Sequence, residues 1–162
     1  MNEIVLGERT EETVRIYFEK AKQPVLKAML PQKAQTVEEA LEDYKETLLP
    51  SATSFGRTIV VDGKYVGDVW CYCIDKEDTP NAMLSYCVFE KDLWNAGVAT
   101  KGIALFLDLI REKIALETIG AFTYADNIAS KKCLKRTALL LKRVLLRMVG
   151  NLATIRGLCN EP

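Results

Sequence analysis

AMLSYCVF (residues 82–89) and WNAGVAT (residues 94–100) decide the fold of this chain. Side chains of the first run alternate between two faces, which predicts a β-strand, and the second run leads into an apolar helix. That helix carries one apolar stripe, formed by Ala99, Ile103, Phe106, Ile110 and Ile114. Small residues at a strand-to-helix turn leave backbone N–H groups open at the helix N-terminus, and this geometry suits a phosphate or pyrophosphate group.

The composition narrows the classes of protein to which the chain can belong. Its 162 residues are enough for one domain with a single core, 49% of them are apolar, and 22 basic residues balance 22 acidic ones. The neutral total gives no electrostatic case for nucleic acid, and no apolar run is long enough for a membrane span. Because a charged-then-apolar leader is also missing, we expect a cytoplasmic protein that contacts neither nucleic acid nor membrane.

The chain has no histidine, which excludes Ser-His-Asp and Cys-His catalysis and any histidine-ligated metal site. Its five cysteines are an odd number without the spacing of a metal site. Cys71 and Cys73 have the pattern of small core residues in a strand. We therefore expect no metal and a reducing compartment.

The rest of the sequence predicts alternating strands and helices. Thr10 caps a first helix, Thr36 with Glu39 forms a capping box before a second, and Asp62-Gly63 marks a β-hairpin. The predicted strands cover residues 3–8, 57–61, 65–74, 82–89 and 117–124, and a last helix begins after Asn127. The order β-α-α-β-β-β-α-β-α predicts a mixed α/β sheet in one domain.

The loop at residues 94–100 resembles the Q/R-x-x-G-x-G/A pyrophosphate loop of the GNAT superfamily of N-acetyltransferases, with Gly97 and Ala99 at matching positions. Trp94 stands where Gln or Arg is usual, although only backbone amides of this loop bind phosphate in the family. The sequence of residues 93–101 looks most like that of the branch that includes ribosomal-protein N-terminal acetyltransferases. The resemblance implies a GNAT-like fold, acetyl-CoA as co-substrate and an acetyltransferase domain over residues 1–137.

The same resemblance implies a set of cofactor-binding residues. Asn127-Ile128-Ala129-Ser130 is similar to the N-x-x-S helix of the family, where Asn127 would bind the pantetheine arm and Ser130 would lie near the cofactor. The alternative for both residues is structural, with Asn127 as a helix N-cap and Ser130 in the first turn. The backbone of the fourth strand, near Tyr86, would pair with pantetheine and polarise the thioester carbonyl. The implied residues are Cys87, Val88, Phe89, Ala96, Gly97, Val98, Ala99, Thr100, Asn127 and Ser130.

The sequence names no catalytic side chain with the same clarity. Acetyl transfer needs a neutral amine and a proton for the departing thiolate. The family often uses a strand glutamate and a tyrosine on the helix after the fifth strand, and Cys133 stands nearest to that tyrosine position. The candidates are Cys133, Glu90 and Tyr124, followed by Glu117 and Asp126, and each has a structural alternative.

The sequence after Thr137 departs from the family pattern, which continues with Gly-Phe and two further strands. Residues 138–149 place apolar and basic side chains in a pattern typical of a helix, so we expect the last two strands to be missing or replaced by helix. Codons that are allowed for residues 137 onward can be read in a reading frame shifted by one base. That frame can encode the missing Gly-Phe and the strand pattern, which favours a frameshift over a native tail. Such a tail, residues 138–162, would leave an open sheet edge and favour a homo-oligomer.

These patterns predict an N-acetyltransferase that moves the acetyl group of acetyl-CoA directly to a primary amine. The sequence does not decide the acceptor, which is either a protein N-terminus or a small molecule such as an aminoglycoside, a polyamine or an amino acid. One alternative is a non-catalytic module that binds acyl-CoA or another phosphate ligand on the same fold. Another is a structural protein whose small-residue turn only lets helix and sheet pack closely.

Overall fold

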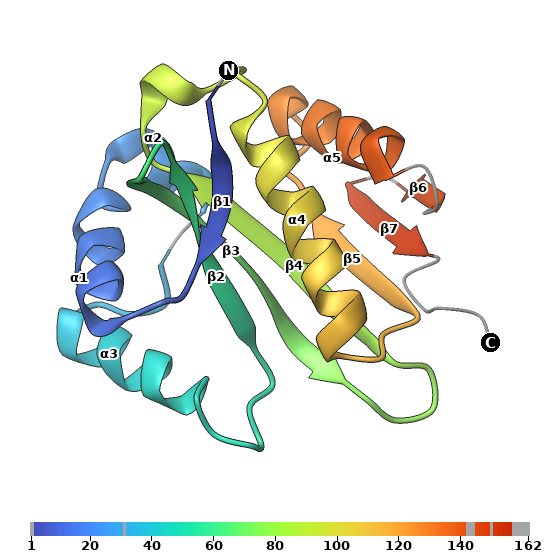
Figure 1. The fold of residues 1–162 in the computed structure, drawn as a ribbon, viewed down its shortest axis with the longest axis horizontal. Coiled ribbons are helices and arrows are strands. Elements are labelled where there is room, and N and C mark those ends of the chain that lie inside the picture. The colour runs from blue at the N-terminus through green and yellow to red at the C-terminus, as the bar shows by residue number, and fades with distance from the viewer. Residues whose placement is uncertain (1, 31, 142–144, 150, 157–162) are drawn as a thin grey trace.

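The computed structural model describes residues 2–30, 32–141, 145–149 and 151–156, which form one seven-stranded sheet with helices around it (Figure 1). The strand order is β1-β2-β3-β4-β5-β7-β6, and each neighbouring pair is antiparallel except β4 with β5. The strands are β1 (Ile4–Gly7), β2 (Phe55–Val61), β3 (Lys64–Asp75), β4 (Asn81–Val88), β5 (Thr118–Phe122), β6 (Leu145–Val149) and β7 (Leu152–Arg156). The helices are α1 (Glu11–Lys20), α2 (Pro24–Met29), α3 (Val37–Glu46), α4 (Val98–Lys113) and α5 (Ile128–Leu141), with a 3₁₀ turn, η1 (Lys91–Leu93).

Two helices begin at the capping residues that the sequence predicts. At α1 the Thr13 N–H donates to Thr10 Oγ1 (3.2 Å) and the Thr10 N–H donates to Thr13 Oγ1 (2.9 Å), which makes a reciprocal capping box. At α3 the Glu39 N–H donates to Thr36 Oγ1 (3.2 Å), but the Glu39 carboxylate accepts from the Gln35 N–H (2.7 Å) and does not complete the box. The predicted element order omits α2, since a helix of six residues is too short to show a clear period.

The predicted apolar stripe of α4 is confirmed. Ile103, Phe106 and Ile110 are fully buried and belong to the main core cluster together with Ile59 of β2 and Ile119 of β5. α4 and α5 lie side by side on this face of the sheet (Figure 1). Burial of large aliphatic and aromatic side chains of this kind stabilises a fold by about 1.5–3 kcal/mol each, so this layer dominates the core.

The opposite face of the sheet carries α1 and α2. Because successive strand residues point to opposite faces, Trp70 of β3 turns away from α4 and meets Tyr17 of α1, with ring centroids 6.1 Å apart. Phe89 and Cys87 join Leu26 of α2 in a second, smaller core cluster on this side. The sheet is therefore covered by different helices on its two faces.

β4 and β5 pair over a short stretch and then separate. Their parallel register joins Asn81–Met83 to Thr118–Gly120. Beyond this point β4 stays paired with β3 as far as Val88, while β5 continues beside β7. The sheet is therefore open between the C-terminal halves of β4 and β5, close to the start of α4.

The C-terminal part contradicts the prediction of missing strands. α5 does extend past Arg136, to Leu141, but Leu145–Val149 and Leu152–Arg156 form an antiparallel hairpin, and β7 pairs with the whole of β5. Alternate residues Ala153 and Ile155 are fully buried, so the period of this segment is that of a strand. The helical prediction was wrong because a short apolar run fits either period, and pairing with β5 decides between them.

Two further expectations rested on that error. The open edge beside β5 does not exist, because β7 fills it. The self-association that was to cover this edge loses its basis for the same reason. The frameshift hypothesis rested on the absence of the last strands, so the fold removes its structural argument. Residues 142–144, 150 and 157–162 of the predicted tail lie outside the described residues.

Candidate active site

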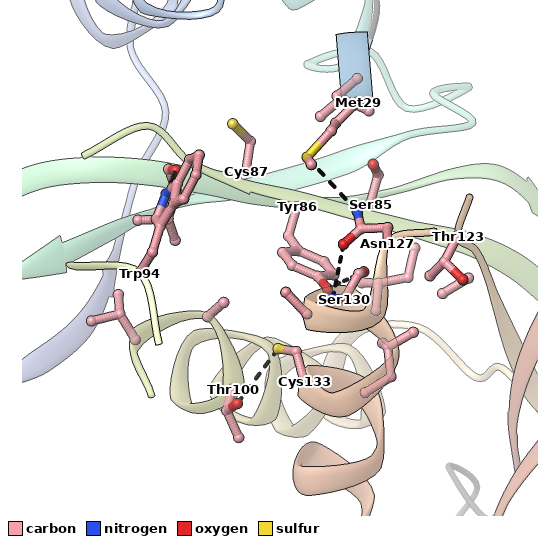
Figure 2. A pocket seen from close by; sticks show the side chains of 18 of the residues that line it. Met29, Ser85, Tyr86, Cys87, Trp94, Thr100, Thr123, Asn127, Ser130 and Cys133 are labelled. Carbon is pink, nitrogen blue, oxygen red and sulfur yellow. Dashed lines mark hydrogen bonds between the residues drawn. The ribbon is translucent and has the colours of Figure 1, made fainter. Parts of the chain in front are cut away.

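A cavity of about 360 Å³ occupies the opening between β4 and β5. It is walled by α2, the second half of β4, the start of α4, the end of β5 and the first turns of α5. Figure 2 shows Cys87 and Met29 on one side of the β4 strand and Tyr86, Thr100 and Cys133 on its other side. Segments that are far apart in the sequence therefore meet at one concave site, the usual setting for ligand binding.

The backbone of β4 presents hydrogen-bonding groups to this cavity. The Phe89 N–H donates to the Val66 carbonyl of β3 (3.0 Å), and groups of an antiparallel strand alternate between its two sides. Tyr86 and Val88 therefore direct their N–H and C=O groups towards the β5 side, where the sheet is open. The indole Nε1 of Trp94 donates to the Val88 carbonyl (2.8 Å) and ties the loop before α4 to β4.

The N-terminus of α4 is built to receive an anion. Gly97, the residue before the helix, has φ +82 and ψ 4, a left-handed conformation that glycine adopts readily, and it supplies no side-chain cap. The N–H groups of Val98, Ala99 and Thr100 belong to the first turn, where an α-helix offers no intrahelical acceptor. A Cβ on Gly97 would meet no atom within 4 Å, so the space beside it is open. Open amides and the helix dipole together favour a phosphate group.

The start of α5 combines a helix cap with a side-chain amide donor that is hydrogen-bonded to a weak acceptor. The Ser130 N–H donates to Asn127 Oδ1 (3.0 Å), so the structural alternative for Asn127, an N-cap, is confirmed. This bond also fixes the orientation of the side-chain amide. Its Nδ2 lies 4.0 Å from Met29 Sδ, a weak acceptor, at the edge of the cavity. Capping the helix and donating to a ligand carbonyl are therefore compatible roles for one side chain.

A cluster of hydroxyl and thiol groups lies between α4, α5 and β4 (Figure 2). The Tyr86 hydroxyl is hydrogen-bonded to Ser130 Oγ, and Cys133 Sγ lies 3.4 Å from Thr100 Oγ1 in a hydrogen bond. Burial raises the pKa of Cys133, although the hydrogen bond from Thr100 opposes this shift. Burial, followed by the neighbouring Cys133, raises the pKa of Tyr86. Both groups keep their protons at neutral pH, so this cluster can donate hydrogen bonds but does not supply a thiolate nucleophile.

The α2 side of the cavity is apolar. Leu26 and Met29 of α2 and the next residue, Leu30, line it, together with Phe122 and Tyr124 at the end of β5, whose rings meet edge to face with centroids 6.1 Å apart. The sequence places this segment in a loop region that could choose the acceptor, but it indicates no particular residue of α2, because the neighbours of these residues in space come from β4 and α5. The side chain of Tyr86 was also missed, although its alternation with Cys87 places it on the α5 face of β4.

The structure brings most of the predicted site residues to the cavity. The predicted residues among its lining are Cys87, Val88, Gly97, Val98, Ala99, Thr100, Tyr124, Asn127, Ser130 and Cys133. Phe89 and Ala96 are not among them. The Phe89 ring packs edge to face on Tyr65 (centroids 5.0 Å apart), and the Ala96 N–H donates to the Leu93 carbonyl (3.3 Å).

Glu90, Glu117 and Asp126 do not line the cavity either. The Glu90 carboxylate lies 3.3 Å from Lys20 Nζ and 3.5 Å from Lys64 Nζ. Slight burial raises the pKa of Glu90, but the hydrogen bonds and charges of these lysines outweigh it, so the pKa is lowered overall. A carboxylate stabilised in its charged form by two ammonium groups is a poor general base.

The described residues form neither a metal site nor a membrane-spanning helix. No group of three or more Cys, Asp or Glu side chains in the described part of the chain is placed to hold a metal ion. Across the same residues, no helix has the length and hydropathy that a membrane crossing requires.

The fold described above is similar to those of several acetyltransferases of known structure. Aminoglycoside acetyltransferase AAC(6')-Ib, solved with coenzyme A, has 12% sequence identity and a TM-score of 0.75 over 96% of this chain and 95% of that one. RimL, a ribosomal L7/L12 alpha-N-protein acetyltransferase solved with coenzyme A, has 14% identity and a TM-score of 0.72 over 94% and 92%. Mycobacterium smegmatis RimJ, solved with a CoA-disulfide, has 15% identity and a TM-score of 0.74 over 94% and 80%.

At these identities the likeness shows the fold, whereas the family is shown by the sequence itself. No curated protein sequence matches the chain significantly. A family profile described as acetyltransferase (GNAT) domain matches residues 6–138, which is most of the chain and includes every residue of the cavity. The chain therefore belongs to the GNAT family of acetyltransferases and is an acetyl-CoA-dependent N-acetyltransferase.

Proposed function

We propose that the chain transfers the acetyl group of acetyl-CoA directly to a primary amine, and that the transfer takes place in the cavity between β4 and β5. One observation carries this proposal. The uncapped N-terminus of α4 and the open backbone edge of β4 meet at the same cavity, so one ligand with a pyrophosphate and an amide-containing arm can use both.

The binding mode follows from the available donors. The pyrophosphate contacts the amides of Val98, Ala99 and Thr100, beside the open space at Gly97. The pantetheine arm lies along the β4 backbone at Tyr86 and Val88 and accepts from Asn127 Nδ2. Coenzyme A in the crystal structures of AAC(6')-Ib and RimL supports this ligand class.

The transfer needs no covalent enzyme intermediate. The neutral amine nitrogen attacks the thioester carbonyl, the C–N bond forms, the C–S bond breaks and the nitrogen loses one proton to water. The thiolate of coenzyme A takes its proton from water. The Cys133 thiol and the Tyr86 hydroxyl, whose raised pKa values keep them protonated, can donate hydrogen bonds to it. Burial also raises the pKa of Cys87, to about 11, so neither cavity cysteine supplies an activated nucleophile.

A thermal-shift scan with acetyl-CoA, coenzyme A and plain nucleotides tests the binding step. Acetyl-CoA and coenzyme A should raise the melting temperature more than ADP does, since only they fill the β4 side of the cavity. No shift with acetyl-CoA would contradict the proposed function. Incubation with labelled acetyl-CoA alone should leave no stable label on the protein, and label on Cys87 or Cys133 would contradict direct transfer.

A further inference from the structure

We infer that the acceptor is a monoamine with an apolar, alkyl or aromatic body, and that polycationic amines are poor acceptors. The inference rests on the proposed function, because it concerns the other substrate of the same cavity. It separates this chain from the aminoglycoside enzymes with which it shares its fold.

The first support is the charge of the cavity. Among the described residues that line it, none is Asp or Glu, and the charged one is Arg136. A diamine, a polyamine or an aminoglycoside brings a second ammonium group in addition to the amine that reacts. An ammonium group that leaves water without a carboxylate partner loses more free energy of solvation than the site returns. Arg136, which is exposed, offers no partner for an ammonium group either.

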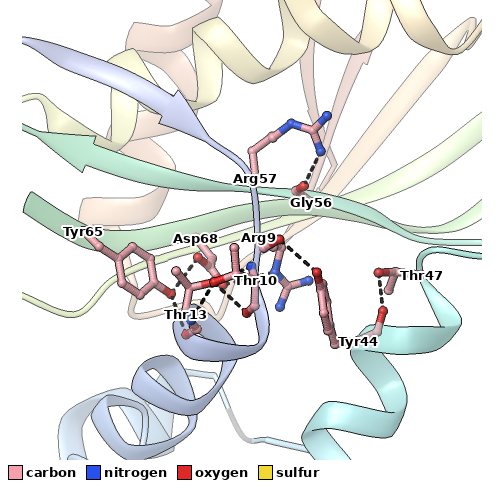
Figure 3. Close-up of polar contacts among 9 residues, drawn as sticks. All are labelled: Arg9, Thr10, Thr13, Tyr44, Thr47, Gly56, Arg57, Tyr65 and Asp68. Carbon is pink, nitrogen blue, oxygen red and sulfur yellow. Dashed lines mark hydrogen bonds and ion pairs between the residues drawn. The ribbon is translucent and has the colours of Figure 1, made fainter. Parts of the chain in front are cut away.

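Asp68 is the carboxylate that the strand register places beside the cavity, but its charge is already used. It pairs in register with Cys87, and its side chain is 2% exposed. The Tyr65 hydroxyl donates to Asp68 Oδ1 (2.8 Å), and Arg9 Nε lies 3.5 Å from Asp68 Oδ2 (Figure 3). The carboxylate is therefore turned into a buried network below Cys87 and is not available to an incoming ammonium group.

The second support is the apolar wall on the α2 side. Leu26 and Leu30 line the inner part, while Met29, Phe122 and Tyr124 remain 44%, 60% and 44% exposed at the cavity. Large apolar side chains left exposed at a cavity favour a ligand whose body covers them. Each methylene group buried here should improve kcat/KM by roughly fourfold, until the wall is covered.

The experiment compares matched amines at saturating acetyl-CoA. Butylamine is compared with 1,4-diaminobutane, and hexylamine with 1,6-diaminohexane, with phenethylamine and kanamycin added. Release of free coenzyme A thiol gives kcat/KM, corrected for the two equivalent ends of each diamine. The monoamine of each pair should be acetylated about tenfold more efficiently or better, and hexylamine should exceed butylamine.

Variants at Met29 test the electrostatic cause, because this exposed side chain tolerates replacement without loss of the core. Met29→Glu should raise kcat/KM for 1,6-diaminohexane relative to hexylamine by roughly tenfold, and Met29→Gln, of similar size and without charge, should leave the ratio nearly unchanged. Equal or better use of the diamines by the unmodified chain would overturn the inference and leave the proposed function standing. Acetylation of no monoamine in the set, with acetyl-CoA bound, would also overturn it. Failure to bind acetyl-CoA would instead contradict the proposed function.

Discussion

The two ends of the cavity present different chemical groups to a ligand. The end at Gly97–Thr100 offers backbone amides and one hydroxyl, that of Thr100, whereas the end at Leu26, Met29 and Phe122 offers apolar side chains. Backbone amides come with any residue that keeps the local conformation, so the first end depends on φ and ψ more than on residue identity. The second end depends on side chains, which a single substitution can change.

This difference explains how one fold serves many acceptors. In the proposed binding mode, the end at Gly97 can bind acetyl-CoA although Trp94 stands where Gln or Arg is usual in the family, because the proposed contacts come from the main chain. The acceptor end is assembled from α2 and from the end of β5, two segments that can vary without disturbing the turn before α4. If both substrates bind as proposed, substrate choice and cofactor binding depend on different segments of this molecule.

The largest effect is expected from a substitution at Gly97, in the end of the cavity that depends on backbone conformation. Gly97→Val should lower acetyl-CoA affinity by about 100-fold or more, since a branched side chain enters the open space beside the first-turn amides and disfavours the positive φ. Isothermal titration measures the loss.

A matched control separates the steric effect from the backbone strain. Gly63, in the hairpin between β2 and β3, has φ +80, close to the +82 of Gly97, and also has open space around its missing Cβ. Gly63→Val should therefore suffer the same strain and keep acetyl-CoA affinity. Equal affinity in both variants would show that the space beside Gly97 is not the phosphate site.

The contribution of the buried Asp68 to the free energy of unfolding should depend on pH. Burial raises the pKa of Asp68 from 3.8 to about 6, although Arg9 and Tyr65 oppose the shift. The folded state therefore holds this proton more tightly than the unfolded chain, and the resulting stability is present below about pH 4 and lost as the pH rises through 6. Between pH 4 and 7 the unmodified chain should lose on the order of 3 kcal/mol relative to Asp68→Asn, which carries no such proton.

Urea unfolding at both pH values measures this difference. Asp43→Asn, at an exposed position on α3, is the control and should follow the pH dependence of the unmodified chain. If the stability of Asp68→Asn changes with pH in parallel with that of the unmodified chain, the Arg9–Asp68–Tyr65 network does not titrate as described.

The two ends also differ in how far the sequence predicts them. Gly97, Ala99 and Asn127 act within a few residues of a helix start, so a local motif was enough to find them. Met29 acquires its position from packing between α2, β4 and α5, which no local period encodes. The alternation along β4 gives the face of Tyr86, but not the contact of its hydroxyl with Ser130. The same limit explains the error in the tail, where a strand at Leu152–Arg156 is defined by its pairing with β5.

A smaller effect is expected where one side chain has two roles. Asn127→Asp keeps an oxygen for the Ser130 N–H and should preserve the stability of α5, but it replaces the Nδ2 donor by an acceptor. Acetyl-CoA affinity should fall by about tenfold, the effect of one lost hydrogen bond with added repulsion. Asn127→Ala should lower both affinity and melting temperature. An unchanged affinity in Asn127→Asp would leave Asn127 with the capping role alone.

The smallest effect should come from Trp94, which joins the loop of the cofactor end to the strand. Trp94→Phe removes the 2.8 Å hydrogen bond from Nε1 to the Val88 carbonyl and keeps most of the ring's contact area. If this bond fixes the loop before Gly97, acetyl-CoA affinity should fall by about fivefold, equivalent to roughly 1 kcal/mol. A rise in affinity would also have a physical cause, because the freed Val88 carbonyl faces the cavity and would accept from a pantetheine amide. A rise in affinity would mean that Trp94 competes with the cofactor for β4, and that side-chain identity matters at this end as well.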